Sequence, residues 1–210
     1  LMIAGRREFD VNGDLNFNLK EQANPNLYVP LITIDGLGLD ATRTTSTDII
    51  ASSVKLLSSI YGSDNTDVTI KTGEGKYHYN SKQIIDPSNI QTNTTPVFAI
   101  DASNLATIQA GRIYLIATKQ GVGVNMAAEI LASKSVNIDA NGDVYYSNIS
   151  AGEEANLKST RSIQSLDITS NIIAPNLTIE ANEFKNFGLV SANNLTIQNS
   201  GTLTNTIHGN

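Results

Sequence analysis

Hydrophobic and polar residues alternate along most of this chain. A short unit recurs in which two apolar residues flank one other residue, and an acid, an amide or a threonine often follows. Alternation with a period of two, carried by β-branched residues, predicts half-buried strands. The unit occurs at residues 31–35, 97–101, 136–139, 166–169, 177–180 and 195–198.

A second short unit, apolar and small, precedes several of these predicted strands. It occurs at residues 50–52, 131–133, 150–152, 173–175 and 190–192. From Ala132 onward the units lie about 20 residues apart, which is the spacing of a coil-by-coil solenoid. Stacking of parallel strands about 4.8 Å apart then predicts about 9–10 coils and a rod about 45 Å long.

Two segments depart from this rhythm. Residues 7–20 carry Asn12-Gly13 between alternating stretches, which predicts an antiparallel hairpin. Residues 71–91 hold several glycines, a Tyr-His-Tyr stretch and Pro87, and predict an insertion or hairpin outside the coils. Residues 47–57 fit a helix or a pair of strands, and we predict strands.

Composition supports an all-β chain with a narrow interior. The chain has 210 residues, of which 40% are hydrophobic but only 6% aromatic, with no Trp. A single domain is the default at this length. The core must be filled by aliphatic side chains, which suits regular thin layers.

Charge and cysteine content exclude several function classes. The formal net charge is -6, so the chain lacks the basic stripe of a nucleic-acid binder. It has no Cys, which excludes disulfide and thiol chemistry, and no apolar run of about 18 residues that would insert into a membrane. The opening LMIAGRREFD shows no signal peptide and starts in mid-pattern, which suggests a fragment or a processed chain.

Recurring acids are the first candidate for chemistry. A carboxylate column on one face would suit a polysaccharide-cleaving β-helix, whereas isolated acids would cap the turns that end their strands. We favour capping, because Thr169 and Gln198 occupy equivalent positions and cannot do acid–base work. The acids are Asp35, Asp101, Asp139 and Glu180.

Two acidic Asn-Gly segments, residues 10–14 and 139–143, suggest calcium loops at first sight. An EF-hand needs Gly at its sixth position, whereas Gly is fourth in both segments. We interpret them as turns. The two histidines, His78 and His208, have no nucleophile in a recognisable elbow, and we assign them surface roles.

The remaining motifs have ordinary structural interpretations. Three G-x-G pairs, at residues 36–38, 73–75 and 121–123, lack the third glycine and the helix of a phosphate site, so we predict turn glycines. Tyr77 and Tyr79 form either an adhesive patch or the packing surface of an extra hairpin, and we favour packing. Formal glycosylation sequons begin at Asn93, Asn148, Asn176 and Asn194, and arise by chance in such a composition.

Two longer stretches resemble a known family. Residues 32–51, ITIDGLGLD followed by TDIIA, and residues 98–124, with FAID, GRIYLIAT and GVGV, resemble the secretion domain of filamentous haemagglutinins. The wider group is the large exoproteins of bacterial two-partner secretion, which includes adhesins, haemolysins and contact-dependent growth-inhibition effectors. The tail from Ile130 resembles the first haemagglutinin repeats.

This resemblance implies a right-handed parallel β-helix with extra-helical hairpins. It also implies two parts, residues 1–125 as the later part of a secretion domain and residues 126–210 as the first repeat coils, with a junction near Gly121–Asn125. The family's Asn-Pro-Asn-Gly-Ile motif is expected before the matched part. We interpret Asn24-Pro25-Asn26-Leu27 as a turn instead.

The functional expectation is a non-enzymatic piece of a secreted or surface-exposed bacterial exoprotein. The resemblance implies a partner outer-membrane transporter, a receptor on a host or neighbouring cell, and roles in export, fibre scaffolding and adhesion. It implies no catalytic residue, no cofactor and no metal site. Two alternatives stay open: a β-helical polysaccharide lyase or hydrolase, and the stalk of a growth-inhibition toxin.

Overall fold

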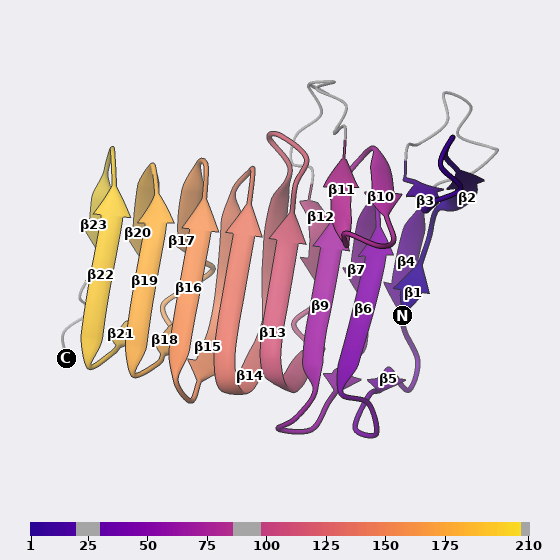
Figure 1. Cartoon of the computed structure of the whole chain (residues 1–210). Coiled ribbons are helices and arrows are strands. Elements are labelled where there is room, and N and C mark those ends of the chain that lie inside the picture. The colour runs from indigo at the N-terminus through magenta and orange to yellow at the C-terminus, as the bar shows by residue number, and fades with distance from the viewer. Residues whose placement is uncertain (20–29, 86–97, 207–210) are drawn as a thin grey trace.

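A computed structural model describes residues 1–19, 30–85 and 98–206, and every regular element in these ranges is a β-strand. The strands wind into a parallel β-helix whose successive coils stand side by side (Figure 1). No helix capable of crossing a membrane occurs in the part described. The predicted all-β solenoid is confirmed, while Asn24–Leu27, Pro87, Asn93 and His208 lie outside the described residues.

Each coil contributes one strand to each of three faces, and each face is a parallel sheet. Face 1 consists of β4 (Leu31–Ile34), β7 (Ser53–Leu56), β12 (Phe98–Ala102), the start of β14 (Gly123–Ala140), the start of β15 (Val144–Ala151), β17 (Ser162–Ser165), β20 (Glu183–Asn186) and β23 (Leu203–Asn205). Face 2 consists of β5 (Leu39–Asp40), β8 (Ile60–Tyr61), the start of β13 (Thr107–Ala117), the middle of β14, the end of β15, β18 (Asn171–Ile173) and β21 (Leu189–Ser191). Face 3 consists of β1 (Met2–Ile3), β6 (Ser46–Ala51), β9 (Asp67–Thr72), the ends of β13 and β14, β16 (Glu154–Ser159), β19 (Asn176–Ala181) and β22 (Asn194–Asn199).

The interior is filled by stacked aliphatic side chains, one from each coil. On face 3, alternate residues point inward, and the strand register places like residues above one another. Burial of these apolar columns supplies the main stabilisation of the fold. One such column runs through Ile49, Ile70, Leu115, Ile138, Leu157, Ile179 and Ile197.

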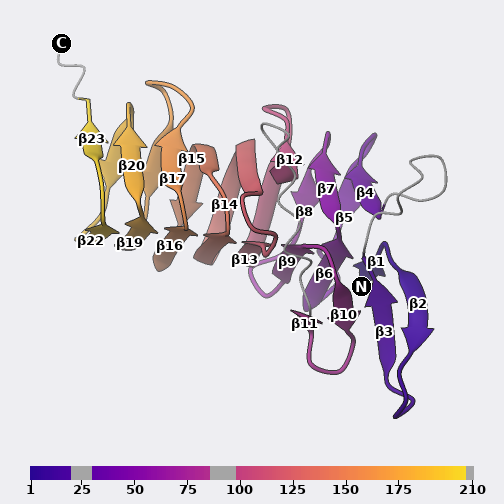
Figure 2. The same ribbon diagram turned by 90° about the horizontal axis from the view of Figure 1, so that it is seen from above.

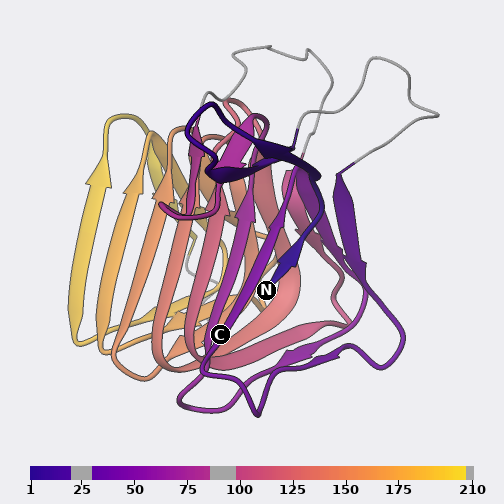
Figure 3. The same cartoon turned by 45° about the vertical axis from the view of Figure 1, so that its right-hand side comes forward.

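The coils number about eight, fewer than the nine or ten predicted. Figure 3 shows them stacked one behind the next. Outside the hairpin insertions, equivalent residues in adjacent coils lie 18 to 25 positions apart, as Asn176–Asn194 and Asp101–Asn125 do, whereas Thr69 and Tyr114 lie 45 positions apart. The shortfall arises because two hairpins leave the coil path and form a separate antiparallel sheet. Those residues add length to the chain without adding coils.

This second sheet confirms both predicted hairpins. It has the order β11 (Gln83–Ile85), β10 (Lys76–His78), β3 (Leu15–Asn18) and β2 (Arg6–Phe9), and it stands outside the β-helix (Figure 2). A small core of Leu19, Ile50 and Tyr77 joins it to face 3. The segment 47–57 forms strands β6 and β7, also as predicted.

One predicted strand is wrong. Residues 166–169 form a turn, and Leu166 and Ile168 are exposed. The reason lies in Asp167, whose carboxylate accepts hydrogen bonds from the backbone N–H groups of Thr169 (2.7 Å) and Ser170 (3.0 Å). These local bonds satisfy the backbone in a turn and compete with strand pairing.

Candidate functional site

A groove lies on the outer side of face 3. It lies where the β10–β11 hairpin stands over strands β6, β9 and β13, and its volume is about 320 Å³. Ligand pockets begin near about 300 Å³, so the groove accommodates only a small molecule or the end of a larger one. Sequence reasoning did not identify this place.

Strand alternation determines which side chains form the floor. In β9, Val68 and Ile70 are buried in the helix interior, so Asp67, Thr69 and Lys71 point outward. The register pairs Thr69 with Asp48 of β6 and with Tyr114 of β13. Three polar side chains from successive coils therefore stand in one row along the floor.

The hairpin wall is fixed to the floor by packing. Tyr77 of β10 is 2% exposed and packs with Ile50 of β6 and with Leu19. The predicted packing role of Tyr77 is confirmed. Tyr79 lies beyond the strand and is 43% exposed.

Polar contacts at the hairpin turn add to this packing. The Lys71 ammonium donates to the carbonyl oxygen of Lys82 at 2.7 Å, and Lys82 Nζ lies 3.8 Å from the Asp48 carboxylate. Lys82 has a φ of 55°, a left-handed conformation that is uncommon for a residue with a side chain. The turn is thus held in a specific geometry against face 3.

Burial shifts the pKa of two side chains in the groove. Desolvation lowers the pKa of Lys71 below its usual value; nearby Lys82 lowers it further, whereas Asp48 acts in the opposite direction. Desolvation also raises the pKa of Tyr77, with smaller contributions from Asp48 and Tyr79. The groove is therefore partly shielded from water.

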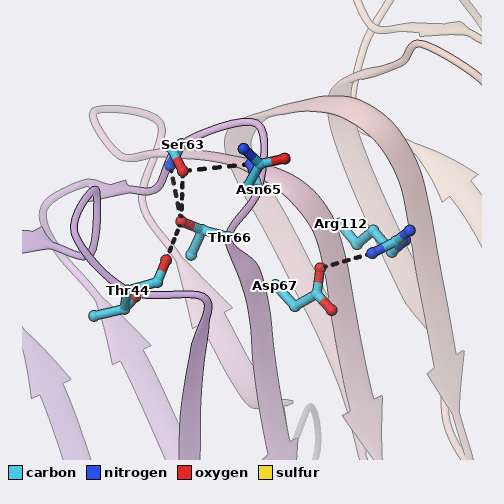
Figure 4. Close-up of polar contacts among 6 residues, drawn as sticks. All are labelled: Thr44, Ser63, Asn65, Thr66, Asp67 and Arg112. Carbon is cyan, nitrogen blue, oxygen red and sulfur yellow. Dashed lines mark hydrogen bonds and ion pairs between the residues drawn. The ribbon is translucent and has the colours of Figure 1, made fainter.

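The opposite end of the groove is organised by a polar turn that precedes β9. The Thr66 hydroxyl donates to the carbonyl oxygen of Thr44 at 2.7 Å and accepts from the Ser63 N–H at 3.0 Å (Figure 4). The next residue, Asp67, receives a hydrogen bond from Arg112 at 3.2 Å. The turn thus fixes where the Asp67 carboxylate stands at the edge of the floor.

The four recurring acids do not converge. Asp35 and Asp101 belong to face 1, whereas Asp139 and Glu180 belong to face 3. On face 3, Lys158 stands between the two acids in the register and pairs with Glu180 at 2.9 Å. A carboxylate on face 1 and a carboxylate on face 3 of the β-helix cannot act together on one bond.

Capping is confirmed for only one of these acids. The Asp35 carboxylate accepts from the Gly36 N–H at 2.7 Å and closes the turn after β4. Asp101 lies within β12 and accepts from the Asn125 amide at 2.8 Å, and Asp139 and Glu180 also lie within strands. For these three the capping prediction is wrong, because the strands extend past them.

The acidic Asn-Gly segments form turns, as predicted. At the tip of the β2–β3 hairpin, the Asp10 carboxylate accepts from the N–H groups of Asn12 (2.8 Å) and Asp14 (3.0 Å), and Gly13 has a φ of 82°. The described residues contain no group of three or more His, Asp or Glu side chains placed to hold a metal ion.

The glycine pairs and His78 behave mostly as expected. Gly36, Gly38, Gly75 and Gly121 have positive φ angles and lie in turns. Gly123 instead begins β14, where a Cβ would lie 2.0 Å from the Asp143 carbonyl oxygen, so this glycine permits close packing of two coils. His78 ends β10 and is half-buried.

Amide ladders are a feature that the sequence analysis missed. Three asparagines that begin sequons, Asn148, Asn176 and Asn194, hydrogen-bond to an asparagine one coil away. The Asn171 amide donates to Asn148 at 2.7 Å, and the Asn194 amide donates to Asn176 at 2.8 Å. The signal was present as asparagines repeating at coil spacing. No such repeat marks the groove residues Asp48, Thr69 and Tyr114, which only the strand register brings together.

Comparison with known proteins gives sequence relatives for about half of the chain. No family model matches. The chain is 38% identical over 102 residues to the "Toxin CdiA" of Yersinia pestis, a match that covers 49% of this chain and 3% of that protein. It is 29% identical over 119 residues to the "tRNA nuclease CdiA-2" of Burkholderia pseudomallei, covering 56% of this chain and 4% of that protein.

A solved structure extends the comparison to nearly the whole chain. The crystal structure of a filamentous haemagglutinin secretion domain superposes with a TM-score of 0.53 at 17% sequence identity, covering 95% of this chain and 57% of that one. At this identity the likeness shows a shared fold. Taken with the CdiA relatives, it confirms the resemblance that the motifs predicted: this chain is similar in sequence to CdiA proteins and in fold to the filamentous haemagglutinin secretion domain.

Proposed function

We propose that this chain is a non-enzymatic scaffold within a secreted or surface-exposed exoprotein. Its coils fold by stacking on one another, and its outer faces carry adhesive contacts. The relatives are CdiA and haemagglutinin proteins of two-partner secretion, which supports a partner outer-membrane transporter and a receptor on another cell. Because this chain spans only 3–4% of the CdiA relatives it matches, a toxin stalk is the specific form of scaffold we favour.

One observation carries the scaffold proposal. The last coil of the described residues repeats the apolar interior positions of the coil before it. Leu195 is 48% exposed, whereas Leu177, which it pairs with in the coil before, is 1% exposed. An unpaired strand edge above an apolar surface is a template for another strand. An added coil of the same kind would fit this edge, as each described coil fits the one before it.

The experiment is an in-frame duplication of one coil. Phe184 pairs with Leu203, so a second copy of residues 184–202 inserted after Thr202 keeps the register. We expect the longer chain to unfold cooperatively at a higher urea concentration. In that chain, Leu195→Ala should cost about 2–5 kcal/mol, as for a buried leucine.

The matched control is Leu195→Ala in the natural chain, where we expect a smaller loss. If the inserted coil is digested by protease and Leu195→Ala costs the same in both chains, the end does not accept a coil. The scaffold proposal would then be wrong.

The absence of catalysis is tested separately. The division of the recurring acids between two faces supports a non-enzymatic segment, even though some relatives are named tRNA nucleases. We expect no turnover of an acidic polysaccharide or of tRNA by this chain. Turnover that disappears in Asp101→Ala or Asp139→Ala would establish the lyase or hydrolase alternative instead.

The division into two parts also remains a proposal. We place the end of the secretion-domain part at residue 125 and the first repeat coils at residues 126–210. Strand β14 spans this position as one continuous element. Export by a partner transporter is tested by fusing residues 1–125 or 126–210 to a signal peptide and assaying each culture medium, with secretion expected only for the first fusion.

A further inference from the structure

We propose that the groove on face 3 binds one neutral pyranose ring, free or at the end of a glycan chain. A sugar is then the ligand class of the adhesive contacts proposed above, and the biological role of this binding rests on that proposed function. The binding itself is a property of the groove. It can therefore be measured whether or not the coils act as a scaffold.

The charges in the groove favour a neutral ligand. The Asp67 carboxylate is paired with Arg112 at 3.2 Å, and the Asp48 carboxylate faces the Lys82 ammonium at 3.8 Å. Lys71 donates to a backbone carbonyl at 2.7 Å. An ionic ligand would have to compete with these existing pairs for its partner, whereas a neutral hydroxyl can donate to a paired carboxylate without breaking the pair.

The remaining lining is both polar and apolar. Ser46 and Thr69 supply hydroxyl groups, and Tyr114 and Ile116 supply apolar surface from the neighbouring coil. A pyranose ring has one apolar C–H face and a rim of hydroxyl groups. An aromatic side chain beside fixed hydrogen-bonding groups matches that chemistry, since its ring packs against the C–H face while polar neighbours orient the hydroxyls.

The rigidity of the site favours recognition of a small ligand. The floor consists of three hydrogen-bonded strands, and the wall is held by the buried Tyr77 and by the contacts of Lys82. Side chains on paired strands lose little freedom on binding, which preserves affinity for a ligand with few contacts. The size of the groove, about 320 Å³, limits the occupant to about one ring.

The row that contains Asp48, Thr69 and Tyr114 continues beyond the groove. The next positions in the register are Asn137 and Asn156, whose amides hydrogen-bond at 3.1 Å. These groups stand along the helix axis at about 4.8 Å per coil. A glycan whose terminal ring occupies the groove could extend over this polar row.

The test uses the full chain and the methyl glycosides of glucose, galactose, mannose and N-acetylglucosamine as probes. We expect saturation-transfer NMR to detect at least one of them, with a dissociation constant of the order of 1 mM. Glucuronate and glucosamine, the charged counterparts, should bind more weakly. The second part of the test compares the methyl glycoside that binds with a tetrasaccharide of the same sugar. If the tetrasaccharide binds more tightly, the site takes the end of a glycan chain. If the two bind equally, the site takes a free sugar.

Two variants in the groove test the geometry. Tyr114→Ala and Thr69→Val should each weaken binding, the first by about tenfold. The matched control is Tyr61→Ala, a 44%-exposed tyrosine on face 2 whose loss should leave binding unchanged. Urea unfolding midpoints establish that each variant remains folded.

Three results would overturn the inference: no transfer to any neutral glycoside, tighter binding of a charged probe, or unchanged binding in both folded groove variants. These outcomes are independent of the coil-duplication experiment. Failure of glycoside binding leaves the scaffold intact, and failure of the inserted coil to fold leaves the groove site standing.

Discussion

Single aspartates determine where several coils turn. Asp40 and Asp167 each accept hydrogen bonds from the N–H and the hydroxyl of the threonine two positions later, at 2.6–3.0 Å for Asp40 and 2.7 Å for Asp167. The threonine hydroxyl is the largest cause that lowers the pKa of each carboxyl group. A charge-assisted bond thus takes the place of strand pairing at Asp167, and it closes the turn that follows Asp40 at the end of β5.

This arrangement predicts a pH dependence for Asp167. Its pKa is lowered in the folded chain, so its contribution to stability is present above its unfolded value of 3.8 and is lost as pH falls through the folded value. Asp167→Asn should therefore lower the urea midpoint at pH 7 and have a smaller effect as the pH falls below 3.8. Because the residue is exposed, the difference will be small, and an equal loss at pH 7 and below pH 3.8 would contradict this account.

A buried polar group occupies the interior of the later coils. Tyr146 is fully buried, and its hydroxyl donates to the Asn186 side-chain oxygen at 2.8 Å. Desolvation raises the pKa of Tyr146 well above its usual value, so the phenol stays protonated and remains a donor. Asn186 in turn donates to Asn205 at 2.8 Å, which links three coils.

Removal of this hydroxyl should cost stability without changing shape. Tyr146→Phe is expected to lower the free energy of unfolding by about 1 kcal/mol, the usual net value of one hydrogen bond. Urea denaturation measures the change. The control is Tyr145→Phe on the neighbouring, half-exposed residue, where we expect no comparable loss.

At the level of elements, turns must avoid the backbone of the next coil. Gly38, in the turn between β4 and β5, has a φ of 79°, and a Cβ there would lie 2.2 Å from the Ser59 carbonyl oxygen. Gly13, at the hairpin tip, has a nearly identical φ of 82° but no atom within 4 Å of a Cβ. The two glycines share a conformation and differ only in surroundings.

This pair separates backbone strain from steric overlap. Gly13→Ala should cost about 1–2 kcal/mol, the strain of a left-handed residue with a side chain. Gly38→Ala should cost clearly more, because the coil below has to move. Thermal or urea unfolding of both variants makes the comparison, and equal costs would show that the coils adjust freely at this corner.

The strand pattern could be predicted well, and the details of the turns could not. Alternation identified β4, β14, β19 and β22, because a half-buried strand requires a period of two. It failed at Leu166–Thr169, where the apolar pattern is that of a strand but the Asp167 hydrogen bonds form a turn. Local side-chain hydrogen bonds of this kind compete with strand formation, and the hydrophobic pattern does not reveal them.

The groove was beyond reach of the sequence for a different reason. Asp48, Thr69 and Tyr114 are separated by 21 and 45 positions, and the second interval includes the hairpin insertion. Only the strand register shows that they stand in one row. Sequence analysis assigned Tyr77 to packing and was right, but it had no means of placing that hairpin over β6 and β9.

For the molecule as a whole, stability should depend on position along the axis. Leu177→Ala, one coil inward from the end of the described residues, removes a buried side chain and should cost about 2–5 kcal/mol. Leu195→Ala in the last coil should cost less than about 1 kcal/mol, since half of that side chain already meets solvent. Urea denaturation of the two variants gives the comparison, and equal losses would mean that the end coil is covered in solution.

The direction of the hydrogen bonds between coils has a mechanical consequence. The strands of all three faces lie across the long axis, so their inter-strand bonds run along it. A pull on the two ends of the column therefore loads the junctions between coils in series, and within each junction the bonds of the three faces share the force. The strength of the whole column is then that of its weakest junction, and adding coils increases reach without increasing resistance to tension.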